Sequence, residues 1–327
     1  MQKLRQKILD FITDNTSFTL TTHDGPDADG LGAEIALAYI LKQLRKKVRI
    51  LNTQAMPDRF RFMDPQGMVD VWVPEKHKGI PKKSALIILD TSDEFHTGAM
   101  KDIIPQFRAV RVIDHHDLNP HSTLDGYIDP GAAATCEMIV DIAGALDIAL
   151  DKETATALYA GLSYDSGSFA YSKTTVRTFK AARALVEAGA DPYEIYGELH
   201  ESASTASLLL HRQVLSTLIL HCGDRVAVLI MRKEDLAATG ARFEDAESFI
   251  NIPLKSKKVL VSIMIKETDE GKIRCSLRSK GLVNVSKIAQ QFSGGGHALA
   301  AGFRSDCSLE ETLARVLKTV EEALVKA

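Results

Sequence analysis

The chain has 327 residues, a length that is long for one compact domain and comfortable for two. Hydrophobic residues make up 45% of the chain and charged residues 25%, which excludes a disordered or fibrous protein. The 40 lysines and arginines against 43 acidic residues give a net charge of −3, which excludes a generally basic duplex-binding protein but not a local basic site.

The first half of the chain alternates strand-like and helical patterns. Short β-branched runs predict strands at residues 18–22, 48–51, 69–73, 85–89 and 109–113. Helical spacing predicts helices near residues 31–46, 134–146, 152–163 and 174–188. This alternation predicts an α/β fold with a doubly wound, mostly parallel sheet.

The second half has a different pattern. Residues 204–220 are helical and bridge the halves, and strands are expected at 225–232, 257–267 and 272–280. A helix near 283–292 precedes a glycine run, and a capped amphipathic helix closes the chain from residue 308. The predicted division is a first domain at 1–189, a helical linker at 190–222 and a smaller α/β domain at 223–327.

No segment predicts export or membrane insertion. The longest apolar stretches are far shorter than the ~20 residues that a membrane span needs, and the N-terminus lacks a signal-peptide core. The four cysteines are scattered without a CxxC pair, so we expect no disulfide framework and no cysteine zinc site. The expected location is the cytoplasm.

Acids and histidines follow three of the predicted strands. His23 comes directly after the first strand, Asp90 ends ALIIL, and Asp114, His115 and His116 end AVRVI. In an open parallel sheet the C-terminal strand ends form the ligand crevice. We therefore expect these side chains at one sheet edge.

The segment HDGPDADGLG gives the most specific signal. His23, Asp27 and Asp29 form an H-x3-D-x-D pattern, in which two carboxylates can point at two different ions. Glycine and proline around them favour tight, stiff turns. The alternative is that both aspartates only cap a helix starting at Leu31, but the whole cluster after a buried strand favours the ligand interpretation.

Three further signals have their own structural alternatives. Asp90 is the first residue of DTSD. Taken alone, it fits a turn residue as well as a functional residue. In DHHD, two adjacent histidines project in different directions, so one can bind a metal while the other faces a phosphate. Asp165, in GLSYDSGSF, taken alone fits a helix C-terminal loop.

Together these residues offer carboxylates and imidazoles without a thiolate. Such mixed oxygen and nitrogen ligands suit Mn²⁺, with Mg²⁺, Fe²⁺ or Co²⁺ as alternatives, better than a structural zinc site. One carboxylate bridging two ions ~3.5–4 Å apart would activate a water and clamp a phosphoryl group. The hypothesis is two-metal hydrolysis of a phosphate ester.

The second half carries a local basic excess, with nine basic and three acidic residues from Lys255 to Lys287. For Lys255, Lys257 and Lys258 a solvated strand face is the favoured interpretation. Arg278 can instead fork onto a phosphate. The run Gly294, Gly295, Gly296 and His297 taken alone indicates a flexible turn, but together with Arg278 it predicts a substrate clamp.

These motifs together resemble the DHH phosphoesterase superfamily, nearly end to end. HDGPDADGLG, DTSD, DHH and GLSYDSGSF resemble its four motifs in order, and NVSKIAQQFSGGGHALAAGF resembles the signature of the DHH-associated C-terminal domain. Within the superfamily the chain is most similar to the bifunctional nanoRNase/pAp-phosphatase branch. Gly25, Ala28 and Ala33-Glu34 depart from the usual first motif, and the glycine loop has no fourth glycine.

The resemblance implies a role for each residue. One Mn²⁺ would be held by His23 and Asp27, the other by Asp29, His115 and Asp165, with Asp90 bridging. His116 would contact the scissile phosphate and Asp114 would orient its neighbours. The substrate would be held by the residues Arg278, Ser286, Gly294, Gly295, Gly296 and His297.

The resemblance also implies the substrates and their alternatives. It implies release of 5′-mononucleotides from short single-stranded oligoribonucleotides and conversion of 3′-phosphoadenosine 5′-phosphate (pAp) to AMP, by a monomer or homodimer. The chief rival is a phosphodiesterase of linear dinucleotides made from cyclic dinucleotide signals. A RecJ-type exonuclease is disfavoured because the chain is short, and a manganese pyrophosphatase because of the GGGH signature and Arg278. A non-catalytic nucleotide-binding module is disfavoured because no proposed ligand is substituted.

Overall fold

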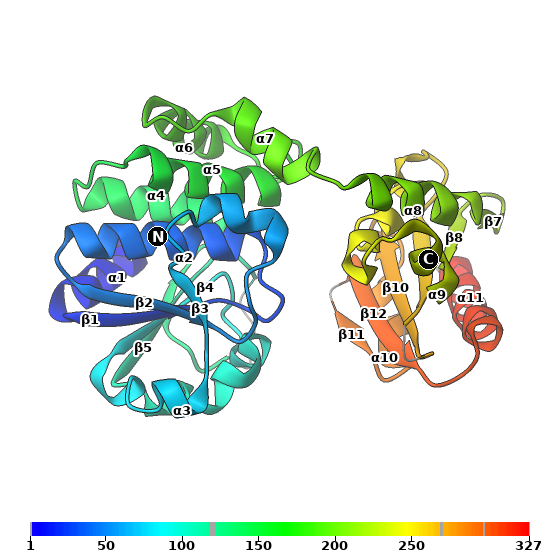
Figure 1. Cartoon of the computed structure of the whole chain (residues 1–327), viewed down its shortest axis with the longest axis horizontal. Coiled ribbons are helices and arrows are strands. Elements are labelled where there is room, and N and C mark those ends of the chain that lie inside the picture. The colour runs from blue at the N-terminus through cyan, green and yellow to red at the C-terminus, as the bar shows by residue number, and fades with distance from the viewer. Residues whose placement is uncertain (1, 118–121, 269–270, 297, 327) are drawn as a thin grey trace. The chain divides into compact units, whose positions relative to one another are not determined.

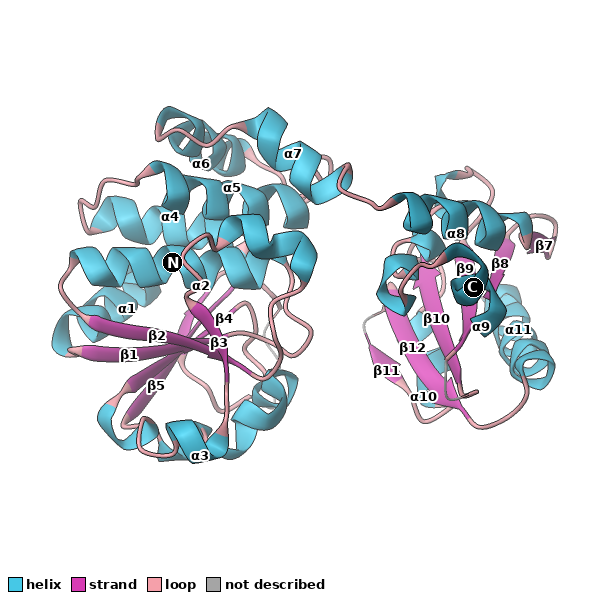
Figure 2. Cartoon of the chain, in the orientation of Figure 1, coloured by secondary structure: helices cyan, strands magenta, loops and turns pink. Residues whose placement is uncertain are grey.

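The computed structural model describes residues 2–117, 122–268, 271–296 and 298–326 (Figure 1). The chain folds into two compact units, Met1–Ser202 and Ala203–Ala327. Each unit has its own sheet, helices and hydrophobic core (Figure 2). The predicted α/β class, with a parallel first sheet and a smaller second α/β unit, is confirmed.

A parallel six-stranded sheet lies at the centre of the first unit, in the strand order β3-β2-β1-β4-β5-β6. The strands are β1 Ser17–Thr21, β2 Lys47–Asn52, β3 Val69–Val71, β4 Ala85–Leu89, β5 Ala109–Asp114 and β6 Gly126–Ile128. Sequence pattern predicts all of these except β6, whose three residues are too few to show a period.

Helices and short 3-10 turns cover both faces of this sheet. The helices are α1 Gln2–Asp14, α2 Ala28–Gln43, α3 Pro74–His77, α4 Thr135–Ala145, α5 Lys152–Asp165, α6 Val176–Glu187 and α7 Pro192–His200. Figure 1 shows α2, α4 and α5 on one side of the sheet, with α6 and α7 farther out. On the opposite face Leu86 and Ile88 of β4 pack against Met100 and Ile104 of the 3-10 turns.

Helix α2 begins at Ala28, three residues before the predicted start at Leu31. Its first turn, Ala-Asp-Gly, is not apolar, so hydrophobic spacing does not reveal it. The helix is buried from Ala28 to Leu41, because α4 and α5 pack on the side that faces away from the sheet. The helix therefore begins inside the HDGPDADGLG motif and not after it.

The sheet register brings the three motif-bearing strand ends together. β1 lies between β2 and β4, and β4 lies between β1 and β5. Thr21 of β1 pairs with Ile88 of β4, and Leu89 pairs with Ile113 of β5. His23, Asp90 and His115 consequently follow three adjacent strands at one sheet edge, as expected.

The second unit contains a mixed six-stranded sheet in the order β11-β12-β10-β9-β8-β7, in which β8 and β9 are parallel and the other neighbours antiparallel. Its strands are β7 Ile219–His221, β8 Val226–Met231, β9 Val261–Glu267, β10 Ile273–Ser279, β11 Gly295–Gly296 and β12 Ala300–Ser305. Its helices are α8 Thr205–Ser216, α9 Lys233–Thr239, α10 Val285–Gln290 and α11 Leu309–Lys326. No helix among the described residues is long and apolar enough to cross a bilayer.

Two predicted boundaries in this unit are wrong. The bridge helix predicted to reach residue 220 ends at Ser216, because Ile219–His221 pairs with β8 as an edge strand. The strand predicted from residue 257 begins at Val261, because residues 253–255 form a 3-10 turn that starts with a proline. At the first of these boundaries, tertiary pairing overrides local pattern.

Candidate metal centre

The loop after β1 is shaped by a glycine and a cap. Gly25 has φ +69°, which glycine adopts without strain, and the Asp24 amide donates to the His96 carbonyl at 2.6 Å. Asp27 caps α2: its Oδ1 accepts from the amides of Asp29 at 2.9 Å and Gly30 at 3.1 Å. Asp27 is therefore a helix cap, as the structural alternative predicted. The same oxygen, Oδ1, also lies 3.8 Å from His23 Nε2, so Asp27 faces the histidine as well.

Asp29 lies in the first turn of α2 and is fully buried. Its carboxylate accepts from two backbone amides at the start of α4, those of Thr135 at 2.6 Å and Cys136 at 2.8 Å. A helix N-terminus stabilises a negative charge, so α4 holds this carboxylate in one orientation. Asp29 thus joins two helices next to the strand ends.

Asp90 follows β4 in a left-handed conformation, with φ +63°. This region is uncommon for residues other than glycine, although aspartate is enriched there. The Thr135 hydroxyl donates to its Oδ1 at 2.9 Å. Its two oxygens each lie 3.5 Å from an imidazole, Oδ2 from His23 Nε2 and Oδ1 from His115 Nε2. Asp90 therefore stands between two histidines from different strands.

The adjacent histidines of the DHH triplet point to different partners. His115 is buried, and its Nε2 lies 3.0 Å from Asp165 Oδ2 and 3.8 Å from Asp29 Oδ2. His116 is 48% exposed, and its Nδ1 lies 2.8 Å from Asp114 Oδ1. A carboxylate can only accept, so Nδ1 carries the proton of that bond and Nε2 is left for another partner.

Among the described residues, three groups bring metal-ligand atoms within 4.8 Å of one another. Two of them share Asp90, and two share His115. Their members are His23, Asp27 and Asp90; Asp29, His115 and Asp165; and Asp90, His115 and His116. The predicted ligands therefore lie in one cluster, to which β1, α2, β4, β5 and α5 contribute.

One buried atom shows that this cluster fits a cation. Within the described residues, His115 Nε2 makes no hydrogen bond of good geometry, although carboxylate oxygens of Asp29, Asp90 and Asp165 lie within 3.8 Å. Its Nδ1 lies 3.4 Å from the Ala132 carbonyl, a contact that leaves Nε2 to act as a ligand. The donor set of nitrogen and oxygen suits a divalent ion such as Mn²⁺ or Mg²⁺.

Crowded charge shifts the pKa values of the cluster in the absence of a metal. Burial, followed by the charge of Asp29, raises the pKa of Asp90 well above its usual range. Burial opposes the charged form of His23, but the Asp27 and Asp90 carboxylates outweigh it and raise its pKa to about 11. Burial likewise disfavours charged His115, yet its carboxylate neighbours raise its pKa to about 10. Surplus negative charge thus draws protons that a cation would replace.

The predicted substrate residues lie in the second unit. Arg278 on β10 pairs with Ala300 of β12, and Gly296 pairs with the next residue, Ala301, so both lie at the same end of the sheet. The Ser286 hydroxyl, on α10, donates to the Gly296 carbonyl at 2.7 Å. His297 lies outside the described residues.

Two glycines of this run have a packing reason. A Cβ on Gly294 would lie 2.3 Å from the Gly302 carbonyl oxygen, and one on Gly296 would lie 2.5 Å from that of Ala300. Gly296 also has φ +132°. Gly295 has open space around its Cα. The glycine run, taken alone, indicates a flexible turn. In the structure Gly295 and Gly296 form the short strand β11, which pairs with β12.

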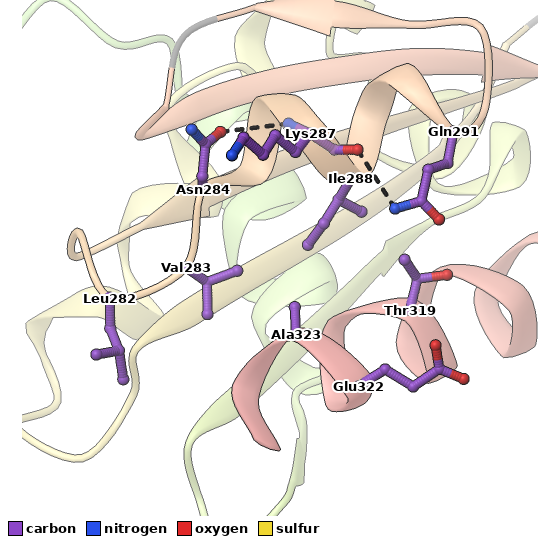
Figure 3. A pocket seen from close by; sticks show the side chains of 9 residues that line it. All are labelled: Leu282, Val283, Asn284, Lys287, Ile288, Gln291, Thr319, Glu322 and Ala323. Carbon is purple, nitrogen blue, oxygen red and sulfur yellow. Dashed lines mark hydrogen bonds between the residues drawn. The ribbon is translucent and has the colours of Figure 1, made fainter. Parts of the chain in front are cut away.

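A pocket of about 470 Å³ lies between α10 and α11. Figure 3 shows Asn284, Lys287 and Gln291 on one wall and Thr319 and Glu322 on the other. Hydrogen bonds of Asn284 and Gln291 to the backbone at Lys287 fix this edge of α10. Of the predicted substrate residues that the structure describes, none lines this pocket.

Sequence reasoning misses Thr135 and Lys173. Thr135 holds Asp90 and Asp29, and the Lys173 ammonium donates to the His115 carbonyl at 3.2 Å. A threonine at the start of a predicted helix is a general capping signal, so it does not single out Thr135.

Comparison with family models matches residues 17–162 to "DHH family, N-terminal domain" and residues 212–326 to "DHHA1 domain". The bifunctional oligoribonuclease and PAP phosphatase NrnA of Thermus thermophilus is 30% identical over 94% of this chain and 90% of that protein. The chain belongs to the DHH family. As a member of it, this DHH protein is a phosphoesterase, a class of hydrolase.

Further similarities extend this result. NrnA of Bacillus subtilis is 25% identical over 86% of this DHH chain and 87% of that protein. The cyclic-di-AMP phosphodiesterase PdeA of Listeria monocytogenes is 26% identical over 97% of the chain, which spans about half of its length (49%). A crystal structure of an exopolyphosphatase-related protein from Bacteroides fragilis matches with a TM-score of 0.90 at 25% identity, covering 100% of this chain and 96% of that one.

Proposed function

We propose that the chain is a manganese-dependent two-metal phosphoesterase that hydrolyses short oligoribonucleotides to 5′-mononucleotides and pAp to AMP. The observation that carries this proposal is Asp90, whose two carboxylate oxygens face imidazoles of two different ligand groups. Relatives named oligoribonuclease and PAP phosphatase match nearly the whole chain and support the choice of substrates.

We assign the ligands to two ions that share the carboxylate of Asp90. His23 and Asp27 would hold one ion, Asp29, His115 and Asp165 the other, and Asp90 would bridge them. Bound ions would supply Lewis acidity and lower the pKa of a coordinated water. The protein prepares this site by fixing Asp27 at a helix cap and Asp29 at the N-terminus of α4.

His116 would contact the phosphate, and Asp114 would orient His116. Asp114 accepts from both Nδ1 and the backbone amide of His116, at 2.8 Å and 3.1 Å, which fixes the ring. When Nε2 carries a proton, His116 would donate it to a phosphoryl oxygen or to the leaving oxygen. Burial raises the pKa of Asp114, but the hydrogen bond with His116 outweighs burial and lowers that pKa, so Asp114 stays a carboxylate that holds the ring.

The second unit would bind the remaining part of the nucleotide through Arg278, Ser286, Gly294–Gly296 and His297. The sheet face of Arg278 is cationic, since Arg274 lies four residues earlier on β10 and pairs with Lys266 of β9. Burial lowers the pKa of Lys266, whose ammonium lies 4.8 Å from the Phe243 ring centroid. Glu244 and Glu247 also act on these groups, so the positive charge that would favour an anionic ligand is partly balanced.

Domain roles follow from these assignments. We assign catalysis to residues 1–189 and substrate binding to 223–327, with 190–222 connecting them. We expect the protein to act in the cytoplasm on single-stranded substrates, as a monomer or homodimer. A second candidate is hydrolysis of linear dinucleotides made from cyclic dinucleotide signals; the match to PdeA, a relative named for cyclic-di-AMP, supports a link to that signalling.

A turnover comparison tests the proposal. Purified protein with Mn²⁺ is assayed on pAp, a diribonucleotide, a longer single strand and inorganic pyrophosphate, each with and without EDTA. We expect turnover of pAp and the diribonucleotide, loss in EDTA and recovery with Mn²⁺. Turnover of the dinucleotide alone favours the second candidate. Activity that is indifferent to the chelator, or a preference for pyrophosphate, contradicts the proposal.

A further inference from the structure

The chain directly after Asp165 forms a turn of unusual backbone geometry, which we call the Asp165 turn (residues 166–173). Gly167, Ser168 and Phe169 are all left-handed, with φ of +58°, +55° and +66°. Two of the three carry side chains, which such a conformation disfavours. Two consecutive strained residues, Ser168 and Phe169, persist only where the surroundings hold them.

Local hydrogen bonds and ring contacts hold this turn. The Ser168 amide donates to the Ser163 carbonyl at 2.7 Å, and the Tyr171 amide donates to the Ser166 carbonyl at 2.9 Å. The Phe169 ring stacks on Phe179 of α6 with centroids 5.6 Å apart. The turn is therefore a defined surface and not a loose connection.

Both ends of the Asp165 turn are attached to the metal centre. Its first residue follows Asp165, a member of the group with Asp29 and His115. At its other end the Lys173 ammonium donates to the His115 carbonyl at 3.2 Å. Tyr171 lies between these two attachments, six residues after Asp165 and two before Lys173.

Tyr171 presents an open aromatic ring at this place. Its exposed fraction is 64%. One side of the ring rests on Gly167, where an added Cβ would lie 2.5 Å from the ring carbon Cζ. Gly167 is thus required twice, for its positive φ and for the space that the ring occupies. The result is a supported ring that offers its remaining surface to a ligand.

We propose that Tyr171 is a base-stacking platform for the nucleotide whose phosphate is bound at the metal centre. The proposal rests on the proposed function and deepens it, because it makes a base-bearing phosphoester the preferred substrate. Aromatic side chains stack on any nucleobase, so the platform selects nucleotides without reading their sequence. The nearby Lys173 ammonium adds positive charge for the phosphate that accompanies the base.

Substrates with and without a base test this role. The chain and its Tyr171→Ala and Tyr171→Phe variants are assayed with Mn²⁺ on a diribonucleotide and on two analogues, each abasic at one position. We expect Tyr171→Ala to lower kcat/KM for the full dinucleotide about 5- to 150-fold, the range for loss of one stacked base. The loss is smaller on the analogue that lacks the stacked base, and Tyr171→Phe restores turnover because it keeps the ring.

Tyr193→Ala is the matched control, since Tyr193 is an exposed tyrosine of the same unit, located on α7. We expect it to behave as the unsubstituted chain. Equal losses for Tyr171→Ala on full and abasic substrates, or no loss on either, overturn the platform while leaving the proposed function intact.

A binding measurement separates this proposal from failure of the proposed function. Calorimetry with Mn²⁺ compares AMP with ribose 5-phosphate, which lacks the base. Tighter binding of AMP that Tyr171→Ala abolishes supports the platform, even if no substrate were turned over. Equal affinities of the unsubstituted chain for the two ligands overturn it.

Discussion

Single residues in this centre serve the fold and the site at once. Asp27 caps α2 and faces His23, while Asp29 holds the start of α4 and faces His115. Asp90 adopts a left-handed backbone, which a buried carboxylate adopts only where other contacts hold it. These contacts hold the side chains in place, and the protonated imidazoles of His23 and His115 carry the positive charge that a bound cation would replace.

Substitution of Asp90 separates these two roles. Asp90→Asn keeps the shape and tolerates a positive φ, but removes the charge that both ligand groups share. We expect turnover to fall at least 1000-fold, on the order seen when a group acting in the transition state is lost. In EDTA the melting temperature stays equal or rises, because the pKa of Asp90 is raised by burial and by Asp29. The control is Asp24→Asn, because Asp24 is exposed and adjacent to His23. Retained activity in Asp90→Asn would show that Asp90 is not part of the mechanism.

Metal binding should release protons. Without a metal the pKa of His23 is about 11 and that of His115 about 10, so both rings are charged at pH 7. As ligands they must be neutral, hence affinity rises with pH below these values. We expect release of at least about one proton per chain at pH 7, measured by calorimetry in buffers of different ionisation enthalpy. Binding without proton release would mean that the two imidazoles are not ligands.

At the scale of elements, the close approach of helices positions Asp29. A Cβ on Gly161 of α5 would lie 2.4 Å from Cys136 Sγ and 2.9 Å from Asp29 Cα. Helices α2, α4 and α5 therefore meet where α2 begins, next to the ligands. A small residue at this crossing keeps the first turn of α2 in place.

Gly161→Ala tests this crossing. Although alanine favours a helix, the added methyl overpacks the contact, and we expect destabilisation of about 1–3 kcal/mol with weaker Mn²⁺ binding. Gly144→Ala in α4 is the matched control, because nothing lies within 4 Å of its added Cβ. It should stabilise the protein by about 0.5–1 kcal/mol. Urea unfolding measures the stability of both variants. Equal changes in the free energy of unfolding for Gly161→Ala and Gly144→Ala would refute the packing argument.

The elements also show what sequence can and cannot predict here. His23, Asp90 and the DHH triplet follow strands, so parallel-sheet geometry predicts that they meet. The contact of Asp29 with Thr135 spans 106 residues, and no local pattern encodes it. The early start of α2 is missed because its first turn is not apolar, and β7 is missed because it owes its conformation to pairing with β8.

At the scale of the whole molecule, the metal ligands and the basic residues proposed to bind substrate belong to two different compact units. The metal-ligand groups of the described residues lie in Met1–Ser202, and the face of Arg278, Arg274 and Lys266 lies in Ala203–Ala327. This separation predicts that substrate affinity and metal affinity respond to different substitutions.

Arg278→Ala tests the separation. We expect kcat/KM to fall, mainly because KM rises. The loss corresponds to about 1.5–3 kcal/mol of transition-state stabilisation, because a charged hydrogen bond is lost. Mn²⁺ affinity should stay unchanged. Lys258→Ala is the control, because its ammonium is largely exposed and pairs with Asp224 at 3.0 Å. Unchanged kinetics in Arg278→Ala would assign Arg278 to the solvated face instead.

Anomalous X-ray scattering at the manganese edge, from crystals soaked in Mn²⁺, tests the central claim most directly. Two peaks are predicted, both bonded to Asp90, one beside His23 and Asp27 and the other beside Asp29, His115 and Asp165. A single ion, an empty cluster, or manganese bound only at other residues would contradict the account.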